Sequence, residues 1–365
     1  MAKDLISNLK LSGSSFLVTG HTGFKGTWLT LLLEELGFEV FGYSLEPTET
    51  SLYTRLQRTN KIVEVFADIR DEKKLNDFFA DLKPSFVVHM AAQPLVLESY
   101  KKPKETFDVN VMGTANILSA SFNSKSVKAV GIVTTDKVYR NNNIEQRFIE
   151  TDPLEGNDPY SASKVATESV VNAWNSIFKG SNGPELVSLR AGNVIGGGDF
   201  AENRIMPDIV RGIISGESIR IRNLLSTRPW QHVLDPLHGY LLGIASAVSE
   251  PEFSKKAYNF GPSEPSYSVG QLLKIIESEF PKLICYSSDD GSNTKHYESK
   301  LLDLDSSLAR NNLGWEPVWS QKAAIISTIK WWKEVLEDRS SPIQATQNDI
   351  QTFLSLQGSG KINLE

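Results

Sequence analysis

The stretch 15-SFLVTGHTGFKG-26 joins an apolar run typical of a buried strand to three evenly spaced glycines. Gly20, Gly23 and Gly26 form a G-x-x-G-x-x-G pattern directly before an amphipathic segment at 25–37. Glycines at this point allow a tight turn and a close approach of the backbone to a pyrophosphate, and the amino terminus of a helix favours negative charge. A glycine triplet alone is weak evidence, but its position between a strand and a helix predicts a dinucleotide-binding loop.

The same alternation of strand and helix continues outward from this loop. Apolar, β-rich runs lie at 15–19, 39–45, 62–68, 85–90, 128–135 and 185–191, and helical patterns lie at 25–37, 71–82, 104–123 and 160–179. This alternation predicts an α/β fold with a doubly wound parallel sheet, that is, a Rossmann domain.

The sequence pattern changes after Arg190. Segments rich in Gly, Pro and Arg, which are typical of loops, alternate there with helical patterns near 236–249, 268–280 and 320–338. We expect a smaller, interleaved α/β substrate-binding domain that covers the carboxyl edge of the sheet. The predicted dinucleotide-binding domain comprises 1–190 and about 234–262, and the substrate-binding domain comprises about 191–233 and 263–365.

Composition excludes several classes of protein. The net charge is -6 without a long basic run, which argues against a nucleic-acid surface. Cys285 is the only cysteine, so a disulfide framework and a cysteine-rich metal site are excluded, and the five histidines show no metal-ligand spacing. No apolar run resembles a signal peptide or a membrane span. We therefore expect a cytoplasmic protein without a metal ion and without a membrane or nucleic-acid partner.

The segment after the second strand leaves the choice of dinucleotide open. The acidic residue that commonly holds the adenosine ribose is missing from 43-YSL-45, since no carboxylate precedes Glu46. NAD is therefore not separated from NADP by this position. Asp68, in 67-ADIRD-71, is a candidate for an adenine contact or for the N-cap of the helix at 71–82.

Two short motifs carry reactive side chains. In 134-TTDKVY-139, Asp136 and Lys137 follow an apolar strand at the sheet edge where ligands bind, although an ordinary solvated ion pair is an equal alternative. In 160-YSASK-164, Tyr160 and Lys164 lie four residues apart on one helix face, so that the ammonium group can lower the pKa of the phenol and reach a cofactor ribose. The glycine loop and Thr135 favour a catalytic pair over a surface pair.

Together these motifs resemble the extended short-chain dehydrogenase/reductase superfamily and, within it, the nucleotide-sugar 4,6-dehydratases. The resemblance covers nearly the whole chain: it includes GHTGFKG, 89-HMAAQPLV-96, Asn110 in 109-VNVMGT-114, TTDKVY, YSASK and 190-RAGNVIGGGD-199. The segments GHTGFKGTWL and TTDKVYRN are similar to the corresponding segments of those members that act on CDP-glucose. The chain departs from most relatives at Lys137, where they have glutamate.

The resemblance implies conversion of CDP-D-glucose to CDP-4-keto-6-deoxy-D-glucose. Thr135 and Tyr160 would bind the 4-hydroxyl group and Tyr160 would take its proton, while Asp136 acts as acid and Lys137 stands where the C5 base stands. The implied NAD contacts are Gly20, His21, Gly23, Phe24, Lys25, Gly26, Asp68, Ile69, Ala91, Ala92, Gln93, Asn110, Thr134, Tyr160 and Lys164. The implied substrate contacts are Gln93, Thr135, Asn193, Arg204 and Arg228, with Arg228 on the diphosphate.

Two roles stay open within this scheme. Converting an aspartate–lysine ion pair to its neutral form costs on the order of 9 kcal/mol in water, so Lys137 is either a base activated by burial or a cation that stabilises an enolate. Both side chains can reach one ligand only if the strand has already ended, because adjacent strand residues face opposite sides. His21 is either a pyrophosphate contact or a loop filler.

Rival functions are an epimerase, a dehydratase for another nucleotide sugar, and a non-catalytic dinucleotide sensor. An epimerase has no use for an acid/base pair beside Thr135, and a sensor could lose Tyr160 or Lys164, which are present. The resemblance further implies a homodimer or a dimer of dimers through helices 104–123 and 160–179, and deoxysugar biosynthesis for a lipopolysaccharide O-antigen.

Overall fold

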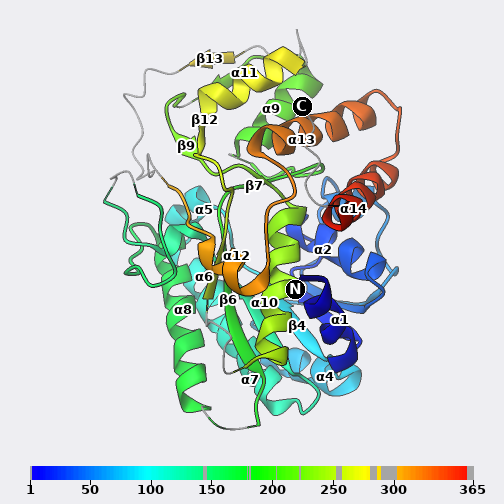
Figure 1. Ribbon diagram of the computed structural model, residues 1–365, viewed down its shortest axis with the longest axis vertical. Helices are drawn as coiled ribbons and strands as arrows, with labels where there is room; N and C mark the ends of the chain where they lie inside the picture. Colours follow the sequence, from blue (N-terminus) through cyan, green and yellow to red (C-terminus); the bar gives the residue numbers. More distant parts are fainter. Residues whose placement is uncertain are drawn as a thin grey trace.

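The computed structural model describes residues 2–142, 146–178, 180, 182–202, 204–221, 223–251, 257–279, 286–288 and 302–359. Its centre is a seven-stranded parallel sheet with the order β11-β6-β5-β4-β1-β2-β3 (Figure 1). The strands are β1 (Ser15–Thr19), β2 (Glu39–Ser44), β3 (Val63–Phe66), β4 (Phe86–His89), β5 (Ala129–Val133), β6 (Glu185–Ala191) and β11 (Ala257–Phe260). The predicted doubly wound sheet is confirmed, and the six predicted strands lie within two residues of their expected bounds.

Helices cover both faces of this sheet. Alternate strand residues point to opposite faces, so Phe16 and Val18 belong to one apolar cluster and Leu17 belongs to the other. The first face is covered by α1 (Ala2–Ser12), α2 (Phe24–Glu35) and α10 (Leu234–Ser249), and the second by α4 (Glu72–Leu82), α7 (Gly113–Asn123) and α8 (Pro159–Ile177). The predicted helix 104–123 is continuous but passes from α6 (Pro103–Phe107) through a π-helical segment, Asp108–Met112, into α7.

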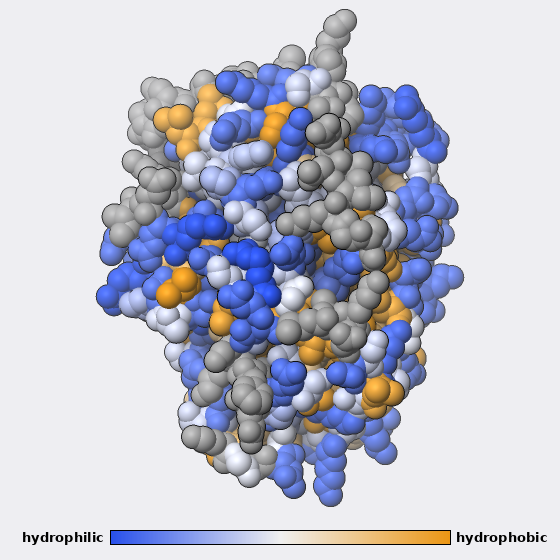
Figure 2. All heavy atoms as spheres, viewed as in Figure 1, coloured by the Kyte–Doolittle hydropathy of each residue, from blue (hydrophilic) through white to orange (hydrophobic). Residues whose placement is uncertain are grey.

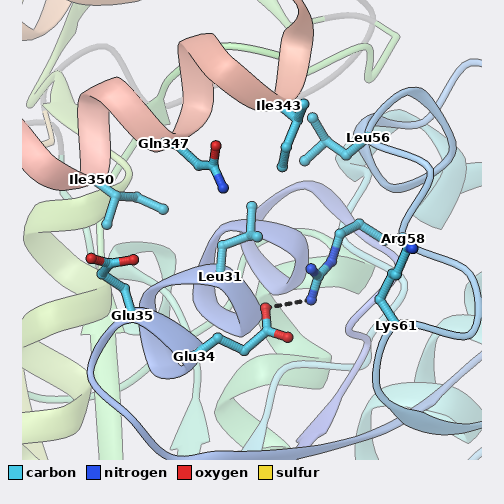
Figure 3. Close-up of a pocket in the computed structure, with 9 residues that line it drawn as sticks. All are labelled: Leu31, Glu34, Glu35, Leu56, Arg58, Lys61, Ile343, Gln347 and Ile350. Atoms are coloured by element: carbon cyan, nitrogen blue, oxygen red, sulfur yellow. Dashed lines mark hydrogen bonds and ion pairs between the residues drawn. The ribbon is translucent and has the colours of Figure 1, made fainter.

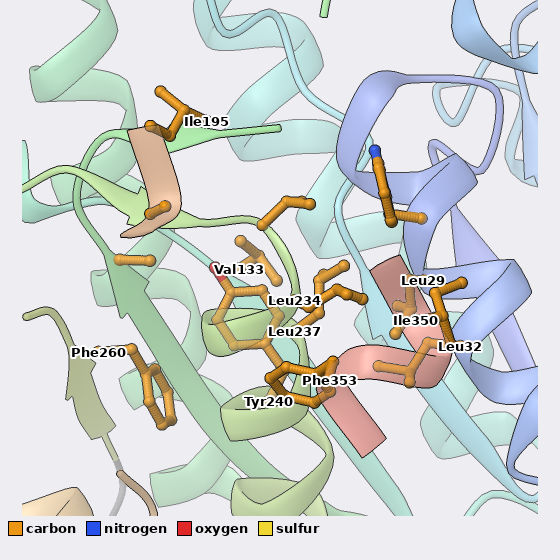
Figure 4. Packing of buried hydrophobic residues seen from close by; sticks show 14 of the residues in the cluster. Leu29, Leu32, Val133, Ile195, Leu234, Leu237, Tyr240, Phe260, Ile350 and Phe353 are labelled. Carbon is orange, nitrogen blue, oxygen red and sulfur yellow. The ribbon is translucent and has the colours of Figure 1, made fainter. Parts of the chain in front are cut away.

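The first face is the more deeply buried. Figure 4 shows Val133, at the end of β5, beside Leu234, Leu237 and Tyr240 of α10. The side chains of all four are at most 8% exposed. This apolar layer holds α10 against the strand ends from which the candidate site is built.

The smaller region lies above the sheet in Figure 1. It contains α9 (Ile205–Ser215), α11 (Val269–Glu279), α13 (Gln321–Leu336) and three two-stranded pairs. The pairs are β7 (Val194–Ile195) with β10 (Gln231–His232), β9 (Thr227–Arg228) with β12 (Tyr267–Ser268), and β8 (Ile219–Ile221) with β13 (Tyr286–Ser288). β7 follows β6 directly, which brings this region to the carboxyl ends of the strands.

Sequence patterns missed several elements of the described chain, and three of them pack on the sheet or on its covering helices. β11 extends the sheet beyond β6, α1 packs on α10 through Leu5 and Leu9, and α14 (Pro342–Ser359) packs beside α13. Gln357 lies within α14, and its side-chain amide contacts the Nδ1 atom of His238 at 2.7 Å. Residues 360–365 lie outside the described part.

The molecular surface is polar with dispersed apolar side chains. Figure 2 shows small, separated hydrophobic patches on the viewed face. Within the described ranges, no helix combines the length and the apolar character that a membrane crossing requires.

Candidate active site

The glycine loop is shaped by steric limits that match its predicted role. Gly20 has a φ of +73°, a left-handed conformation that favours glycine, and a Cβ atom at Gly26 would stand 2.1 Å from the carbonyl oxygen of Gly20. α2 begins at Phe24 with Gly23 as its N-cap, so no side chain covers the first amide groups of the helix. Free amide groups at a helix amino terminus are donors for phosphate oxygens.

His21 is turned from the loop into the sheet. Its Nε2 atom lies 2.7 Å from a carboxylate oxygen of Glu64 in β3, and its ring stacks with Phe66 and lies over Gly42 of β2. The side chain is fully buried, and burial lowers its pKa. His21 therefore ties the loop to β2 and β3, and its ring is an internal anchor.

Lys25 reaches from the first turn of α2 to α10. Its Nζ atom donates a hydrogen bond to the hydroxyl group of Tyr240 at 2.9 Å. Burial, together with the charges of Arg204 and Lys164, lowers the pKa of Lys25 to about 7. Tyr240 was not among the predicted site residues, and its partner is 215 positions away in sequence.

The reactive motif begins where β5 ends. Val133 is the last residue of the strand, and Asp136–Val138 form a short 3-10 helix, so Asp136 and Lys137 are released from the alternation of a strand. The hydroxyl group of Thr135 donates to the Oδ1 atom of Asp136 at 2.9 Å, and the Nζ atom of Lys137 lies 3.4 Å from the same oxygen. The side chain of Asp136 is 1% exposed and that of Lys137 is 29% exposed. Because the strand ends before Asp136 and Lys137, both side chains can reach the same ligand.

Tyr160 and Lys164 project from the first turns of α8, which Asp158 caps through the backbone amides of Tyr160 and Ser161. Burial raises the pKa of the Tyr160 phenol to about 12, although the hydroxyl group of Thr135 acts in the opposite direction. Lys164 donates to the carbonyl oxygen of Val133 at 3.1 Å, and burial lowers its pKa to about 8. The expected lowering of the Tyr160 pKa by Lys164 is therefore wrong for this arrangement, because loss of hydration dominates.

A buried ion pair between Glu168 of α8 and Arg190 of β6 lies next to Thr134. The hydroxyl group of Thr134 donates to Glu168 at 2.6 Å, and Glu168 accepts two hydrogen bonds from Arg190 of β6 at 2.9 and 3.0 Å. Arg190 also donates to Tyr139, whose hydroxyl group donates to Asn259 of β11. Sequence reasoning missed this network, although Glu168 lies four residues after Lys164 on the same helix.

The loop after β4 is held by amide side chains. Asn110 accepts from the backbone amide of Gln93 at 2.8 Å and donates to Ser163 of α8 at 2.8 Å. The amide of Gln93 contacts Leu95 and Thr106, and the backbone amide of Ala91 donates to Thr19. These contacts fix the segment that includes Ala92 beside the glycine loop, since Gly20 closely approaches Ala91.

Asp68 does not cap the following helix. Its carboxylate accepts from Arg70 at 2.6 Å, and that hydrogen bond lowers the pKa of Asp68. Asp71 is the N-cap of α4 and accepts from the amide of Lys74. The N-cap interpretation of Asp68 is thus wrong, while the buried Ile69 beside it packs against Gly113.

Three of the predicted substrate residues, Asn193, Arg204 and Arg228, lie on separate segments of the smaller region. Asn193 is half-buried, and its carbonyl oxygen accepts from the backbone amide of Gln231. Arg204 donates to Asp199 at 3.3 Å, and its charge acts on both Tyr160 and Lys25. Arg228 is buried in β9 and donates to the carbonyl oxygen of Thr227. A Cβ atom on Gly192 would lie 2.7 Å from Pro229 and 3.1 Å from the Oδ2 atom of Asp136, which puts the 228–229 segment next to the acid.

A separate cavity of about 310 Å³ lies at the other end of α2 (Figure 3). Its walls come from α2, the 56–61 segment and α14, and Arg58 is paired there with Glu34 at 2.5 Å. None of the predicted catalytic or substrate residues lines it. Among the residues that the structure describes, no group of three histidine, cysteine, aspartate or glutamate side chains could hold a metal ion, and Cys285 and His296 lie outside that part.

Comparison with known proteins identifies related sequences and folds. A family model described as the NAD dependent epimerase/dehydratase family matches residues 16–261. The CDP-glucose 4,6-dehydratase of Salmonella typhimurium is 40% identical over 94% of this chain and 97% of its own length. The dTDP-D-glucose 4,6-dehydratase of Homo sapiens is 27% identical over 87% of this chain and 89% of its own.

Solved structures share the fold at lower identity. A dTDP-glucose 4,6-dehydratase from Streptomyces venezuelae, determined with NAD bound, matches 88% of this chain and 97% of its own with a TM-score of 0.74 at 22% identity. A UDP-glucose 4-epimerase from Thermotoga maritima matches 88% of this chain and 99% of its own with a TM-score of 0.74 at 23% identity.

Proposed function

This chain belongs to the NAD dependent epimerase/dehydratase family, and from that premise we propose that it converts CDP-D-glucose to CDP-4-keto-6-deoxy-D-glucose and water. The observation that carries the proposal is that Asp136, paired with Lys137, accepts a hydrogen bond from Thr135, whose hydroxyl group also acts on the pKa of Tyr160. An epimerase needs the Thr135–Tyr160 part alone. The added carboxylate and amine supply what elimination of water requires.

Tyr160 begins the reaction by accepting the proton of the sugar's 4-hydroxyl group, while Thr135 orients that hydroxyl. Bound NAD would supply the hydride acceptor for C4 and, once reduced, the hydride donor for C6. The pKa of about 12 means that Tyr160 needs a nearby positive charge to become a phenolate near neutral pH. The charge of Arg204 acts on the pKa of Tyr160 in this direction, and Lys164 lies on the same helix face as Tyr160.

Asp136 and Lys137 perform the elimination. The 4-ketone acidifies the C5 proton, Lys137 removes it, and Asp136 protonates the C6 hydroxyl group so that it leaves as water. Lys137 returns a proton to C5 when C6 is reduced. Asp136 suits its role because its Oδ2 atom is buried and has no hydrogen-bond partner in the described chain, which leaves it available to a sugar hydroxyl.

The residues present fit the cofactor. The close approach at Gly26 and the left-handed Gly20 leave a backbone cradle that a side chain would fill, and the open amino terminus of α2 suits a pyrophosphate. We assign the nicotinamide end to Tyr160, Lys164 and Thr134, and the adenosine end to Asp68 and Ile69. Ala91, Ala92, Gln93 and Asn110 would form the wall between them.

Substrate recognition rests on the smaller region. We assign Arg228 and Arg204 to the diphosphate, since guanidinium groups bind such oxygens in pairs, and Asn193 and Gln93 to the sugar. Cytosine recognition is carried by the similarity to the Salmonella enzyme. The domain division at about 190, 234 and 262 is part of the same proposal, with the substrate held between the two parts.

We further propose a cytoplasmic homodimer or dimer of dimers that serves deoxysugar synthesis for a surface polysaccharide. Apolar side chains are exposed on the helices predicted to pair: Phe107 is 38%, Met112 54% and Ile177 69% exposed. Exposed apolar side chains on one helical face favour burial against a second copy.

The test is to incubate the purified protein and NAD separately with CDP-glucose, dTDP-glucose, GDP-mannose and UDP-N-acetylglucosamine, and to follow the mass of each nucleotide sugar. We expect loss of one water from CDP-glucose alone. Loss from another nucleotide sugar would correct the substrate, and an epimer without loss of mass would contradict the dehydratase assignment.

A further inference from the structure

A buried glutamine side chain in the smaller region joins segments that are far apart in sequence. Gln321 is the first residue of α13, and its side chain is fully buried. Its Oε1 atom accepts from the backbone amides of Trp230 at 3.2 Å and Tyr267 at 3.3 Å, and its Nε2 atom donates to the carbonyl oxygen of Pro265 at 2.6 Å. The side-chain amide of Gln321 therefore binds the backbone of two other segments.

These two segments form the strand pair that carries Arg228, the residue assigned to the diphosphate. Arg228 of β9 lies opposite Tyr267 of β12, and Trp230 follows Arg228 by two residues. The indole Nε1 atom of Trp230 donates to the carbonyl oxygen of Tyr267 at 3.2 Å, which adds a bond between the segments beyond the strand pairing. Gln321 fixes both segments at once, because one side-chain oxygen accepts from each of them.

The segment 228–230 also passes next to the acid of the proposed reaction. Pro229 lies beside Gly192, where a Cβ atom would stand 2.7 Å from the proline ring and 3.1 Å from the Oδ2 atom of Asp136. Arg228 is 7% exposed, and its guanidinium group donates to the carbonyl oxygen of Thr227. Since the Arg228 side chain is packed in this way, its position follows that of the backbone that Gln321 holds.

We propose that Gln321 is a positioning residue for substrate binding, an inference that rests on the proposed function. It fixes the segment 228–230 so that the guanidinium group of Arg228 meets the diphosphate of the nucleotide sugar. Without Gln321 the amides of Trp230 and Tyr267 lose this acceptor, and a buried donor that loses its acceptor draws the backbone toward another one. A displaced Arg228 then binds the diphosphate less well, while the reacting groups on β5 and α8 keep their places.

The experiment measures the binding of CDP by calorimetry, because CDP carries the diphosphate and its binding requires no turnover. Gln321→Met keeps the length of the side chain and removes its hydrogen bonds, so the Kd for CDP should rise about tenfold, the weight of roughly one hydrogen bond at the diphosphate. In an Arg228→Lys background the same change should raise the Kd by less than about twofold, because a positioning residue acts only through the group that it positions. The Kd for NAD should not change.

Thr328→Val is the matched control for this experiment. Its hydroxyl group is fully buried on the same helix and donates to Ala324 within that helix, so the Kd for CDP should equal that of the wild-type protein. A second measurement uses the wild-type protein and requires no variant. CDP should slow hydrogen exchange at the backbone amides of Trp230 and Tyr267, since binding stabilises the segment against local opening.

The positioning role would be overturned by an unchanged Kd for CDP in Gln321→Met, by an undiminished effect in the Arg228→Lys background, by an equal effect of Thr328→Val, or by unchanged exchange at the two amides. Equal losses of CDP and NAD affinity in Gln321→Met would also overturn it, because they indicate a general disturbance of the fold. A wild-type protein that binds CDP but releases no water from CDP-glucose would contradict the dehydration alone. One that binds no CDP would contradict the proposed substrate and the role of Gln321 together, so the failures are distinguishable.

Discussion

Lys137 is the residue at which the resemblance to nucleotide-sugar dehydratases implies a glutamate in most members. It lies 3.4 Å from Asp136 and is more exposed than the acid. If it removes the C5 proton, Lys137→Met should lower kcat by about a hundredfold to ten-thousandfold, the usual contribution of a general base. Oxidation at C4 would persist, so the absorbance of reduced nicotinamide should build up when CDP-glucose is added.

Lys137→Glu is the matched variant, because a carboxylate at this position can also act as a general base. It should recover part of the lost kcat. Equal loss in both variants, with retained exchange of the C5 proton into deuterated water, would assign the amine to enolate stabilisation instead.

The buried Lys164 side chain should make the stability of the protein depend on pH. Burial lowers its pKa from 10.5 to about 8, so the unfolded chain binds one more proton than the folded protein between those values. Stability should therefore rise with pH in that window, because the cost of a buried ammonium group disappears as it loses its proton. Compared with Lys164→Met, the wild-type protein should gain urea resistance from pH 8 to pH 10.5. A difference between the two proteins that does not change with pH would contradict the buried charge.

Local patterns predicted the reactive residues better than their partners. Thr135, Asp136 and Lys137 are neighbours in sequence, and Tyr160 and Lys164 share a helix face, so their proximity followed from spacing. The pairs His21–Glu64 and Lys25–Tyr240 join distant segments, and single residues carry no signal for such contacts. The direction of the Tyr160 pKa shift was also missed, since it depends on burial.

At the scale of elements, the turn from β1 to α2 is limited by backbone contact. Gly26→Ala would place a methyl carbon 2.1 Å from the carbonyl oxygen of Gly20, which cannot move without displacing the loop. We expect a loss of NAD affinity of at least about tenfold, because close backbone approach to the pyrophosphate is lost. Gly270→Ala is the control: its nearest contact is 3.4 Å, so NAD titration should be unchanged. Wild-type NAD affinity in Gly26→Ala would contradict the loop assignment.

The junction of β5, β6 and α8 depends on the buried pair of Glu168 and Arg190. Glu168→Gln leaves the guanidinium group without its counter-charge, and removing one partner of such a pair costs about 3–5 kcal/mol. Urea unfolding should show this loss, whereas Asp77→Ala, which removes an exposed partner of Lys73, should leave the midpoint unchanged. Equal midpoints for Glu168→Gln and the wild-type protein would show that the pair does not hold the site.

The predicted elements followed from strong local periodicity, and the missed ones lacked it. The six predicted strands are apolar runs between turn signals, as is usual for a buried parallel sheet. β11 is only four residues long, and its place beside β6 depends on α10 crossing the first face of the sheet. Among the side chains of α1 whose burial is described, Leu5 and Leu9 are buried, so the apolar pattern of this helix is short and its packing on α10 could not be predicted from the sequence.

For the molecule as a whole, the proposed dimer rests on apolar side chains that are exposed on the helices predicted to pair. Met112 is 54% exposed in the π-helical segment. Met112→Glu should convert the homodimer to a monomer in light scattering at micromolar concentration, because a charge would be buried at the contact. Leu11→Glu, at an 87% exposed position on α1, is the control and should leave the mass unchanged. A wild-type protein that is itself monomeric would contradict the proposed dimer.

The central claim is that one active site moves hydrogen from C4 to C6 while water leaves. The most direct measurement incubates the protein and NAD with CDP-glucose that carries deuterium at C4, and then follows the product by mass spectrometry and NMR. Because the hydride should remain within the site, the product is predicted to have lost H₂O and to carry the deuterium in its C6 methyl group. Deuterium that is lost to solvent or retained at C4, or a product that has lost no water, would contradict the account.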